Sequence, residues 1–337
     1  MAKRLLVTGC AGFIGSRVVE RLLRAGEYVV GVDNFDDGYN PQLKRWRLKR
    51  FERHRRFRFH QMDICHADYL DGLFRGYKSM VKHPELEQEP FSAVLHFAAR
   101  AGVRASVGRP RAYFRVNCFG TINLLEMCRK WDVKKFVLAS TSAVYGKADR
   151  LPFSEEQDTS RPLSPCAASK KAAEAMAHAY HNLHGLDVSV LRYSTVYGAA
   201  GRPDMSISRF IQQIAEGQPI VVHGDGNQQR DFTYVSDIAR GTVAALRPLG
   251  FEIINLGSDQ PVKLNAAIEI ISELLGRTPE INRQPPQAAD VPVAWAKIDK
   301  AKKLLGWEPR VAFEEGIRRA VAWYSKNRKR AAAIALR

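Results

Sequence analysis

The stretch LLVTGCAGFIGSRV, residues 5–18, decides the fold of this 337-residue chain. Its apolar beginning is typical of a buried strand, and its end favours a helix. Between them, the glycine spacing G-x-x-G-x-x-G lets the backbone turn tightly and brings the free N–H groups of a helix N-terminus against a pyrophosphate. We therefore predict a dinucleotide site here, which includes Gly9, Gly12, Phe13, Ile14 and Gly15.

A second apolar strand, 28–32, ends in an acidic residue, Asp33, which Asn34 follows. This acid strengthens the prediction of a dinucleotide site. The glycines alone would be weak evidence, because glycines also end strands for steric reasons. A carboxylate at this place accepts hydrogen bonds from an adenosine ribose and repels a 2′-phosphate. We assign both residues to the site and predict NAD rather than NADP. The alternative is that Asp33 only holds the turn before Asn34.

Three further strands are predicted at 57–62, 93–97 and 135–139, with helices between them. This alternation is typical of an α/β fold with a Rossmann-type doubly wound parallel sheet, covered by helices on both faces. Ligands bind such sheets beyond the carboxyl ends of the strands. Residues that follow two of these strands therefore join the predicted cofactor site: Asp63, Ile64, Ala98 and Ala99.

The elements become mixed after residue 190, where helices are predicted at 204–216 and 235–246. We expect residues 1–190 to form the Rossmann domain that binds NAD, and the chain to return to it in part around 230–260. Residues 191–330 are expected to form a smaller lobe that mainly binds the substrate.

The composition is ordinary for a globular protein, with 45% hydrophobic residues, except for a net charge of +17. No apolar run approaches the roughly 18 residues of a membrane span, so we expect a cytoplasmic protein without a membrane partner. The five cysteines are scattered and lack metal-ligand spacing. We therefore predict neither a disulfide framework nor a metal site.

A basic run at 44–58, KRWRLKRFERHRRFR, carries much of the positive charge. Its mixture of basic and aromatic residues could grip a phosphate backbone, which makes a nucleic-acid binder one alternative. We interpret the run instead as a helix with a solvated basic face, and with Trp46, Leu48 and Phe51 partly buried. Nucleic acid is therefore not an expected partner, and salt-dependent affinity for DNA would test this interpretation.

Several separate motifs, in order, carry a resemblance that covers nearly the whole chain: residues 8–15, Asp33, 140–146, 164–170 and 230–232. With them, the chain resembles the extended short-chain dehydrogenase/reductase family and, within it, the nucleotide-sugar 4-epimerases. Three segments follow the pattern of the UDP-glucuronate 4-epimerases: 98–104, 195–198 and 201–205.

The resemblance implies an enzyme that keeps NAD bound and uses it to take a hydride from C4 of a sugar, while a base removes the hydroxyl proton. The 4-keto sugar then turns and is reduced on its other face. Lys170 would bring the pKa of the base toward working pH and hold the nicotinamide ribose. Thr141 would hydrogen-bond the reacting oxygen, and Tyr193 matches a position that lines the cofactor pocket.

The chain departs from the family where the proton-transferring tyrosine belongs. The family pattern is Tyr-x-x-x-Lys on one helix, here predicted at 165–183, and this chain has Cys166 four residues before Lys170. A thiol titrates near 8.5 and Lys170 could lower that value, but the sulfur ends roughly 4 to 5 Å short of a tyrosine hydroxyl. Losing a positioned acid/base costs on the order of 10² to 10⁴ in rate, so we expect weak or absent epimerisation.

Three explanations of Cys166 stay open. It is an introduced substitution that slows turnover, a natural variant whose base is a water or another group, or the mark of a nucleotide-sugar binding protein without turnover. The remaining motif residues are intact, which argues against a site that lost its function long ago.

The residues after the fifth strand restrict which type of reaction is expected. Related dehydratases and decarboxylases carry an acid at the places where this chain has Ser142 and Ala143, so the resemblance implies simple epimerisation. A uronate carboxylate in a buried pocket needs a counter-charge, and a planar guanidinium supplies it through paired hydrogen bonds. The expected substrate-binding residues are Arg202, Thr195 beside it, Arg104, the diphosphate-binding Arg230 and the ribose-binding Asp290.

The substrates implied by the resemblance are UDP-glucuronate and UDP-galacturonate, and the nearest alternative is 4-epimerisation of UDP-glucose and UDP-galactose. The family also implies a homodimer, in which two long helices of each subunit, here 108–130 and 165–183, pair with those of the other.

Overall fold

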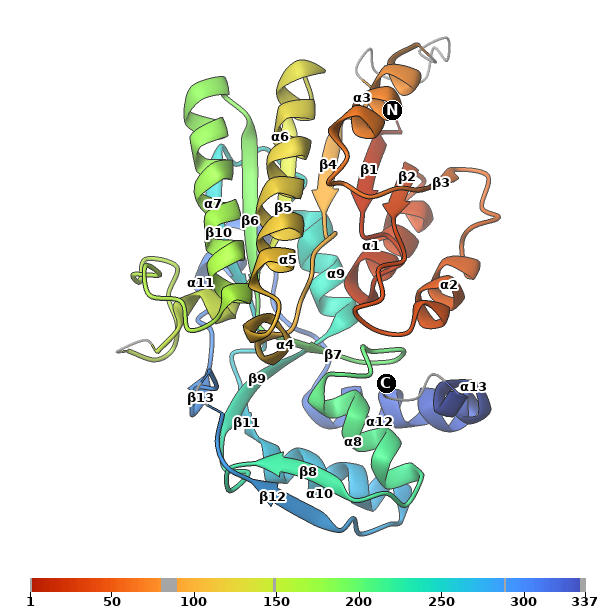
Figure 1. Ribbon diagram of the computed structural model, residues 1–337, viewed down its shortest axis with the longest axis vertical. Coiled ribbons are helices and arrows are strands. Elements are labelled where there is room, and N and C mark those ends of the chain that lie inside the picture. Colours follow the sequence, from red (N-terminus) through yellow and green to blue (C-terminus); the bar gives the residue numbers. More distant parts are fainter. Residues whose placement is uncertain (1, 80–89, 148–149, 288, 334–337) are drawn as a thin grey trace.

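The fold is built around one seven-stranded parallel sheet (Figure 1). The computed structural model describes residues 2–79, 90–147, 150–287 and 289–333. In spatial order, the strands are β10 (Phe251–Leu256), β6 (Asp187–Tyr193), β5 (Lys135–Thr141), β4 (Ala93–His96), β1 (Arg4–Thr8), β2 (Tyr28–Asp33) and β3 (Phe57–Gln61). The predicted α/β class with a doubly wound parallel sheet is confirmed.

Helices cover both faces of this sheet because successive side chains of a strand point to opposite sides. Leu5 and Val7 of β1 belong to a core cluster with residues of α1 and α9, whereas Leu6 belongs to a second cluster with residues of α3, α6 and α7. These helices are α1 (Phe13–Arg24), α9 (Val235–Ala244), α3 (Ala67–Ser79), α6 (Gly120–Lys130) and α7 (Pro165–His184). Burial on both sides explains why β1, β2 and β4 consist mostly of consecutive apolar residues.

The helix predicted at 108–130 forms from Pro110 to Lys130, with a π-helical turn in it. It consists of α5 (Pro110–Phe114), the π-helical turn η1 (Arg115–Phe119) and α6, which follow one another without a gap; a separate short helix, α4 (Val103–Val107), precedes them. Pro110 suits the first position of α5, where no N–H is needed. Within the π-helical turn, Asn117 is buried and donates from its Nδ2 to the Arg100 carbonyl at 2.9 Å and to Ser169 Oγ at 2.9 Å. The turn thereby ties the loop after β4 to α7.

Most of the segments after β6 form smaller sheets and helices that lie below the large sheet in Figure 1, whereas the helix at Asp299–Leu305 lies beside β10. Their strands are β7 (Thr195–Tyr197), β8 (Ile220–His223), β9 (Gln229–Tyr234), β11 (Pro261–Lys263), β12 (Ile281–Gln284) and β13 (Val293–Ala294). Their helices are α8 (Ser206–Ala215), α10 (Leu264–Leu275), α11 (Asp299–Leu305), α12 (Phe313–Lys326) and α13 (Arg328–Ala333). Among the described residues of this half, only β10 joins the large sheet, beside β6. The division of the chain near residue 190 stays a prediction.

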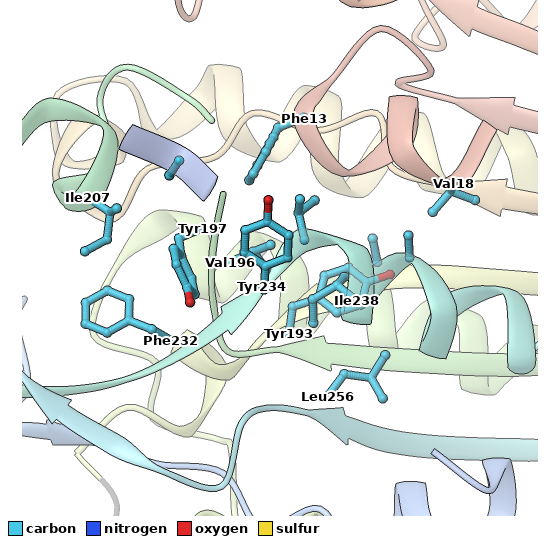
Figure 2. Packing of buried hydrophobic residues seen from close by; sticks show 14 of the residues in the cluster. Phe13, Val18, Tyr193, Val196, Tyr197, Ile207, Phe232, Tyr234, Ile238 and Leu256 are labelled. Carbon is cyan, nitrogen blue, oxygen red and sulfur yellow. The ribbon is translucent and has the colours of Figure 1, made fainter. Parts of the chain in front are cut away.

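The two halves share one apolar core, which Figure 2 shows from close by. Phe13 and Val18 of α1 belong to the same cluster as the aromatic residues of β7 and β9. Tyr197 makes edge contacts with Phe232 and Tyr234, with ring centroids 6.0 and 5.5 Å apart. The helix that follows the glycine turn is therefore held from both halves.

The basic run at 44–58 differs from its prediction. A helix, α2 (Pro41–Lys49), ends within the run, and β3 begins at Phe57, so the run is not one helix. Leu48 and Phe51 are buried as predicted, but so are two of the basic residues, Lys44 and Arg47. Tertiary contacts decide their burial, and these cannot be read from the local charge pattern.

No helix in the described part of the chain is long and apolar enough to cross a membrane. The five cysteines are free thiols. Across the described ranges, no group of three or more His, Cys, Asp or Glu side chains is arranged to hold a metal ion.

Candidate active site

A pocket of about 430 Å³ lies where the strands of the large sheet reach their carboxyl ends. It gathers residues from both halves of the chain. The predicted site residues that line it are Gly9, Gly12, Phe13, Ile14, Gly15, Asp33, Asn34, Asp63, Ile64, Ala98, Ala99, Thr141, Cys166, Lys170, Tyr193, Thr195, Arg202, Arg230 and Asp290. Of the predicted residues, Arg104 alone lies outside this lining.

The glycine turn leaves no room for side chains. Gly9 has a φ of +67°, and a Cβ there would lie 2.7 Å from the Ala98 backbone nitrogen. A Cβ on Gly15 would lie 2.2 Å from the Gly9 carbonyl oxygen. Gly12 precedes α1 without a side chain to cap it, so the first N–H groups of the helix stay available to an anionic ligand. This turn fits the pyrophosphate of a dinucleotide.

The carboxylate of Asp33 is held in place by its surroundings. Its Oδ2 accepts a hydrogen bond from the Ala11 amide at 3.2 Å, and its Oδ1 accepts one from the Phe35 amide at 2.8 Å. The buried Lys44 Nζ lies 3.9 Å from Oδ1. Asp33 therefore holds the turn that the alternative interpretation assigned to it, and it also lines the pocket.

At the end of β3, Asp63 is tied to its neighbours. Asn34 donates from Nδ2 to Asp63 Oδ2 at 3.2 Å, and the Cys65 amide donates to Oδ1 at 2.8 Å. These hydrogen bonds hold the pKa of Asp63 below its ordinary value despite the opposing effect of burial. The structure thus joins two predicted cofactor residues from different strands at one edge of the pocket.

The three predicted catalytic residues line the same pocket. Thr141 ends β5, where its Oγ1 accepts from the Ala143 amide at 3.1 Å. Ser164 caps α7 through the Ala167 amide at 3.2 Å, and the helix then places Cys166 and Lys170 one turn apart on the face toward β5. Lys170 Nζ donates to the Ala139 carbonyl at 2.8 Å, so its cation is anchored beside Thr141.

The protonation of Cys166 differs from the sequence-based expectation. Burial raises the pKa of the thiol above its ordinary value, and this effect outweighs the opposing influence of Lys170 and of the Gly102 amide. Lys170 is also buried, which lowers its pKa to about 8. The thiol is therefore neutral near pH 7 and a poor base.

The burial of Lys170 predicts a pH dependence of stability. Its pKa is about 8 in the folded protein and 10.5 ordinarily, so between these values the unfolded chain binds more protons than the folded protein. The free energy of unfolding should therefore rise with pH across this window by up to about 3 kcal/mol. Urea unfolding of the ligand-free protein on both sides of the window would measure this rise. Lys170→Met serves as the control and should lack this component; an identical pH slope in both proteins would contradict the prediction.

A buried polar network underlies the catalytic residues. Glu174 of α7 accepts hydrogen bonds from Ser140 Oγ at 2.5 Å and from Arg192 Nε and NH2 at 3.1 and 2.8 Å. Glu174 and Arg192 are 2% and 1% exposed. Tyr145 covers the guanidinium, with its ring centroid 4.8 Å from Arg192 Cζ. This network joins α7, β5 and β6 directly behind Thr141 and Lys170.

Arg202 lies in the loop after β7 and is already engaged. Its Nε and NH2 donate to Asp204 at 3.0 and 2.6 Å, and NH2 also donates to the Ala101 carbonyl at 3.0 Å. Asp204 is an exposed loop residue. A ligand carboxylate that binds Arg202 would therefore share the guanidinium with Asp204 or displace it.

The other predicted substrate residues lie around the pocket. Arg104 of α4 forms an ion pair with Asp290 at 2.7 Å, which places Arg104 beside the lining. Arg230 donates from NH1 to the Gln229 carbonyl at 2.8 Å. Thr195 lines the pocket at the start of β7, whereas the hydroxyl of Tyr193 pairs with Thr242 of α9 at 2.9 Å.

The lining also contains polar residues that the sequence analysis did not assign to the site, among them Tyr39, Lys44, Arg100 and Ser194. Tyr39 and Lys44 follow Asn34 in the loop and first turn after β2, a position that could have marked them as neighbours of the cofactor. Arg100 forms an ion pair with Asp36, and its NH2 lies 3.3 Å from Asp37. Because β1 lies between β2 and β4, this ion pair crosses above the end of β1.

Comparison with known proteins places this site in a family. The GDP-mannose 4,6 dehydratase family matches residues 6–320. A UDP-glucuronate 4-epimerase from Thermodesulfobacterium geofontis is 51% identical over 323 residues, which are 96% of each chain. A crystal structure of a UDP-glucuronic acid 4-epimerase from Bacillus cereus, in complex with UDP-glucuronic acid and NAD, is 34% identical with a TM-score of 0.87, covering 96% of this chain and 99% of that one.

A UDP-glucose 4-epimerase from Thermotoga maritima, crystallised with UDP-glucose, is 30% identical with a TM-score of 0.86 and the same coverage. These matches span nearly the whole chain, and they confirm the resemblance that the motifs indicate. The protein therefore belongs to the GDP-mannose 4,6 dehydratase family of extended short-chain dehydrogenases/reductases, and within it most resembles the UDP-glucuronate 4-epimerases.

Proposed function

We propose that the protein is an NAD-dependent 4-epimerase that interconverts UDP-glucuronate and UDP-galacturonate. The observation that carries this proposal is one pocket that joins the glycine turn, the Thr141–Lys170 pair and Arg202. The residues after Thr141 are Ser142 and Ala143, so no carboxylate stands there to support elimination or decarboxylation. A relative named UDP-glucuronate 4-epimerase shares 51% of its residues with this chain.

Each group at the centre of the pocket has a proposed role. NAD, when bound, would accept the hydride from C4 of the sugar and return it to the opposite face. Thr141 would hydrogen-bond the C4 oxygen, and the Lys170 cation would stabilise negative charge that develops beside it. Arg202, with Thr195, would hold the uronate carboxylate, and Arg230 and Asp290 would hold the diphosphate and the ribose.

The second candidate is a nucleotide-sugar binding protein without turnover, and Cys166 is the observation that favours it. A neutral thiol is a weak base, and it lacks the reach of a tyrosine hydroxyl. The two candidates bind the same ligands, so binding alone does not separate them.

NMR of UDP-glucuronate incubated with NAD and the Cys166→Tyr variant tests the proposed function. We expect signals of UDP-galacturonate to appear, and UDP-glucose to react more slowly under the same conditions. Conversion of UDP-glucose alone would overturn the uronate assignment and favour the neutral-sugar epimerase. Binding of both nucleotide sugars without conversion by either form would favour the binding protein.

Removing the guanidinium of Arg202 should separate uronate binding from general nucleotide-sugar binding. In Arg202→Met, the affinity for UDP-glucuronate is expected to fall about tenfold or more, because the carboxylate loses a charge-assisted partner. The affinity for UDP-glucose, which lacks the carboxylate, should change little. Calorimetry with both ligands on one protein preparation measures the two effects, and an equal loss for both ligands would contradict the assigned role.

We also propose a homodimer through the predicted helix at 108–130 and α7. Large apolar side chains are exposed there, including Phe119 at 61% and Leu183 at 70%. Such side chains on adjacent helices are typical of an interface. Leu183→Glu is expected to yield monomers in analytical ultracentrifugation. Tyr69→Glu, at an equally exposed position on α3, is the control and should leave the assembly unchanged; a dimer in both variants would refute this interface.

Three further expectations remain part of the proposal. The segments after residue 190 supply Thr195, Arg202, Arg230 and Asp290 to the pocket, which supports a lobe that mainly binds the nucleotide sugar. The protein is proposed to act in the cytoplasm. Nucleic acid is not proposed as a partner.

A further inference from the structure

The loop that carries Arg202 is held from the other half of the chain by two arginines. Arg17 of α1 donates from NH2 to the Ala199 carbonyl at 3.0 Å. Arg47 of α2 donates to the Ala200 carbonyl from Nε and NH2 at 3.1 and 2.7 Å, and NH2 also reaches the Gly201 carbonyl at 3.3 Å. Three successive carbonyls are thus fixed directly before Arg202.

Arg47 is an unusual residue because its charge is buried without an acid beside it. It is 1% exposed, and within the described part of the chain it has no carboxylate partner in an ion pair. Burial lowers its pKa from the ordinary value. A buried charge is costly unless hydrogen bonds compensate it, so the contacts with the loop carbonyls must offset this cost.

The loop has a shape that needs support. Ala200 adopts a φ of +59°, in the left-handed region that residues with a Cβ rarely occupy. The paired donors of Arg47 bind the carbonyl of this same residue. Without them, the backbone is free to relax toward a more favourable conformation, and Arg202, two residues further on, would move with it.

Arg47 also reaches the wall of the pocket through Tyr39. Its NH1 donates to the Tyr39 hydroxyl at 2.5 Å. The ring of Tyr39 lines the pocket, and its centroid lies 5.8 Å from Arg202 Cζ. One buried side chain therefore fixes both the loop before Arg202 and an aromatic ring beside its guanidinium.

We propose that Arg47 is a positioning residue that sets the preference for a uronate by holding Arg202 in place; this inference rests on the proposed role of Arg202. Arg47 would not touch the substrate, and it would act through the loop carbonyls and Tyr39. It also gives a role to part of the basic run at 44–58, whose interpretation as a solvated face does not apply to this residue.

The test compares binding of UDP-glucuronate and UDP-glucose to the NAD-loaded protein by calorimetry. Arg47→Met is expected to lower the affinity for UDP-glucuronate about tenfold and to change the affinity for UDP-glucose by less than about twofold. Arg45→Met is the matched control, because Arg45 is exposed on the same helix, and both affinities should stay unchanged. Combining Arg47→Met with Arg202→Met should add no further loss, since the two act as one unit.

Each other outcome overturns the inference. An equal loss of affinity for both ligands would mean that Arg47 only supports the fold. Additive losses of UDP-glucuronate affinity in the double variant would mean that Arg47 acts independently of Arg202. Failure of the proposed function is recognised separately, because Arg202→Met alone would then leave UDP-glucuronate binding intact. If Arg47→Met does not fold, Arg47→Lys replaces it: the charge is kept but the paired donors are lost, so the same selective loss is expected.

Discussion

Replacing Cys166 by tyrosine is expected to raise the rate of UDP-glucuronate epimerisation by on the order of 10² to 10⁴. The thiol at this position is buried, and its pKa is raised, so it is protonated where a base is needed. A tyrosine hydroxyl would extend further from α7 toward the sugar oxygen that Thr141 is proposed to bind. It would also lie near the Lys170 cation, which favours the phenolate. Initial rates from NMR, with NAD added to both proteins, measure the change.

Cys166→Phe is the matched control for this experiment. It fills the same space with a ring that has no hydroxyl, so it should not restore turnover. Equal rates for the Cys166 and tyrosine forms would show that the base lies elsewhere, and a gain in the phenylalanine form would assign the effect to packing rather than to proton transfer.

Removing the carboxylate of Glu174 is expected to lower the free energy of unfolding by about 3 to 5 kcal/mol. In Glu174→Leu, the guanidinium of Arg192 remains buried at 1% exposure without its counter-charge, and Ser140 loses its acceptor. Loss of one member of a buried ion pair costs far more than loss of an exposed pair. Urea unfolding of the two proteins, at a pH where both carboxylates and guanidinium groups are charged, measures the difference.

Two further variants test the cause of this loss. Adding Arg192→Leu to Glu174→Leu should recover most of the stability, because no unpaired charge is left. Glu315→Gln breaks ion pairs with Arg318 and Arg319 on the surface of α12 and should cost less than about 1 kcal/mol. A Glu174→Leu variant as stable as the surface variant would show that Arg192 finds another way to satisfy its charge.

The fold and the core of the site follow from local sequence patterns. The glycine turn at 9–15 and the acid at the end of β2 depend on backbone geometry over a few residues, so their sequence spacing identifies them. Parallel strands then bring the residues after β1 to β6 to one edge of the sheet. This is why distant residues such as Asp33, Asp63 and Thr141 line a single pocket.

The sequence-based predictions are wrong where contacts between residues far apart in the chain decide burial or pKa. Lys44 and Arg47 look like members of a solvated basic face, but the structure buries both of them. The influence of Lys170 on Cys166 has the expected sign, yet desolvation outweighs it, and desolvation depends on packing that no local pattern shows. The predicted helix at 108–130 forms from Pro110 to Lys130, but it contains a π-helical turn that the sequence analysis did not predict. The roles assigned to individual site residues remain predictions.

The order of strands limits how this protein can be divided into stable fragments. The strand β10 pairs with β6 along its whole length, although some 60 residues of the other sheets separate the two in the chain. A fragment that stops near residue 190 would leave β6 as an apolar edge, with open backbone groups on which another chain could add a strand. Such a fragment is prone to aggregate, so truncation is a poor route to an isolated cofactor-binding module, and point substitutions in the full chain are the better tool.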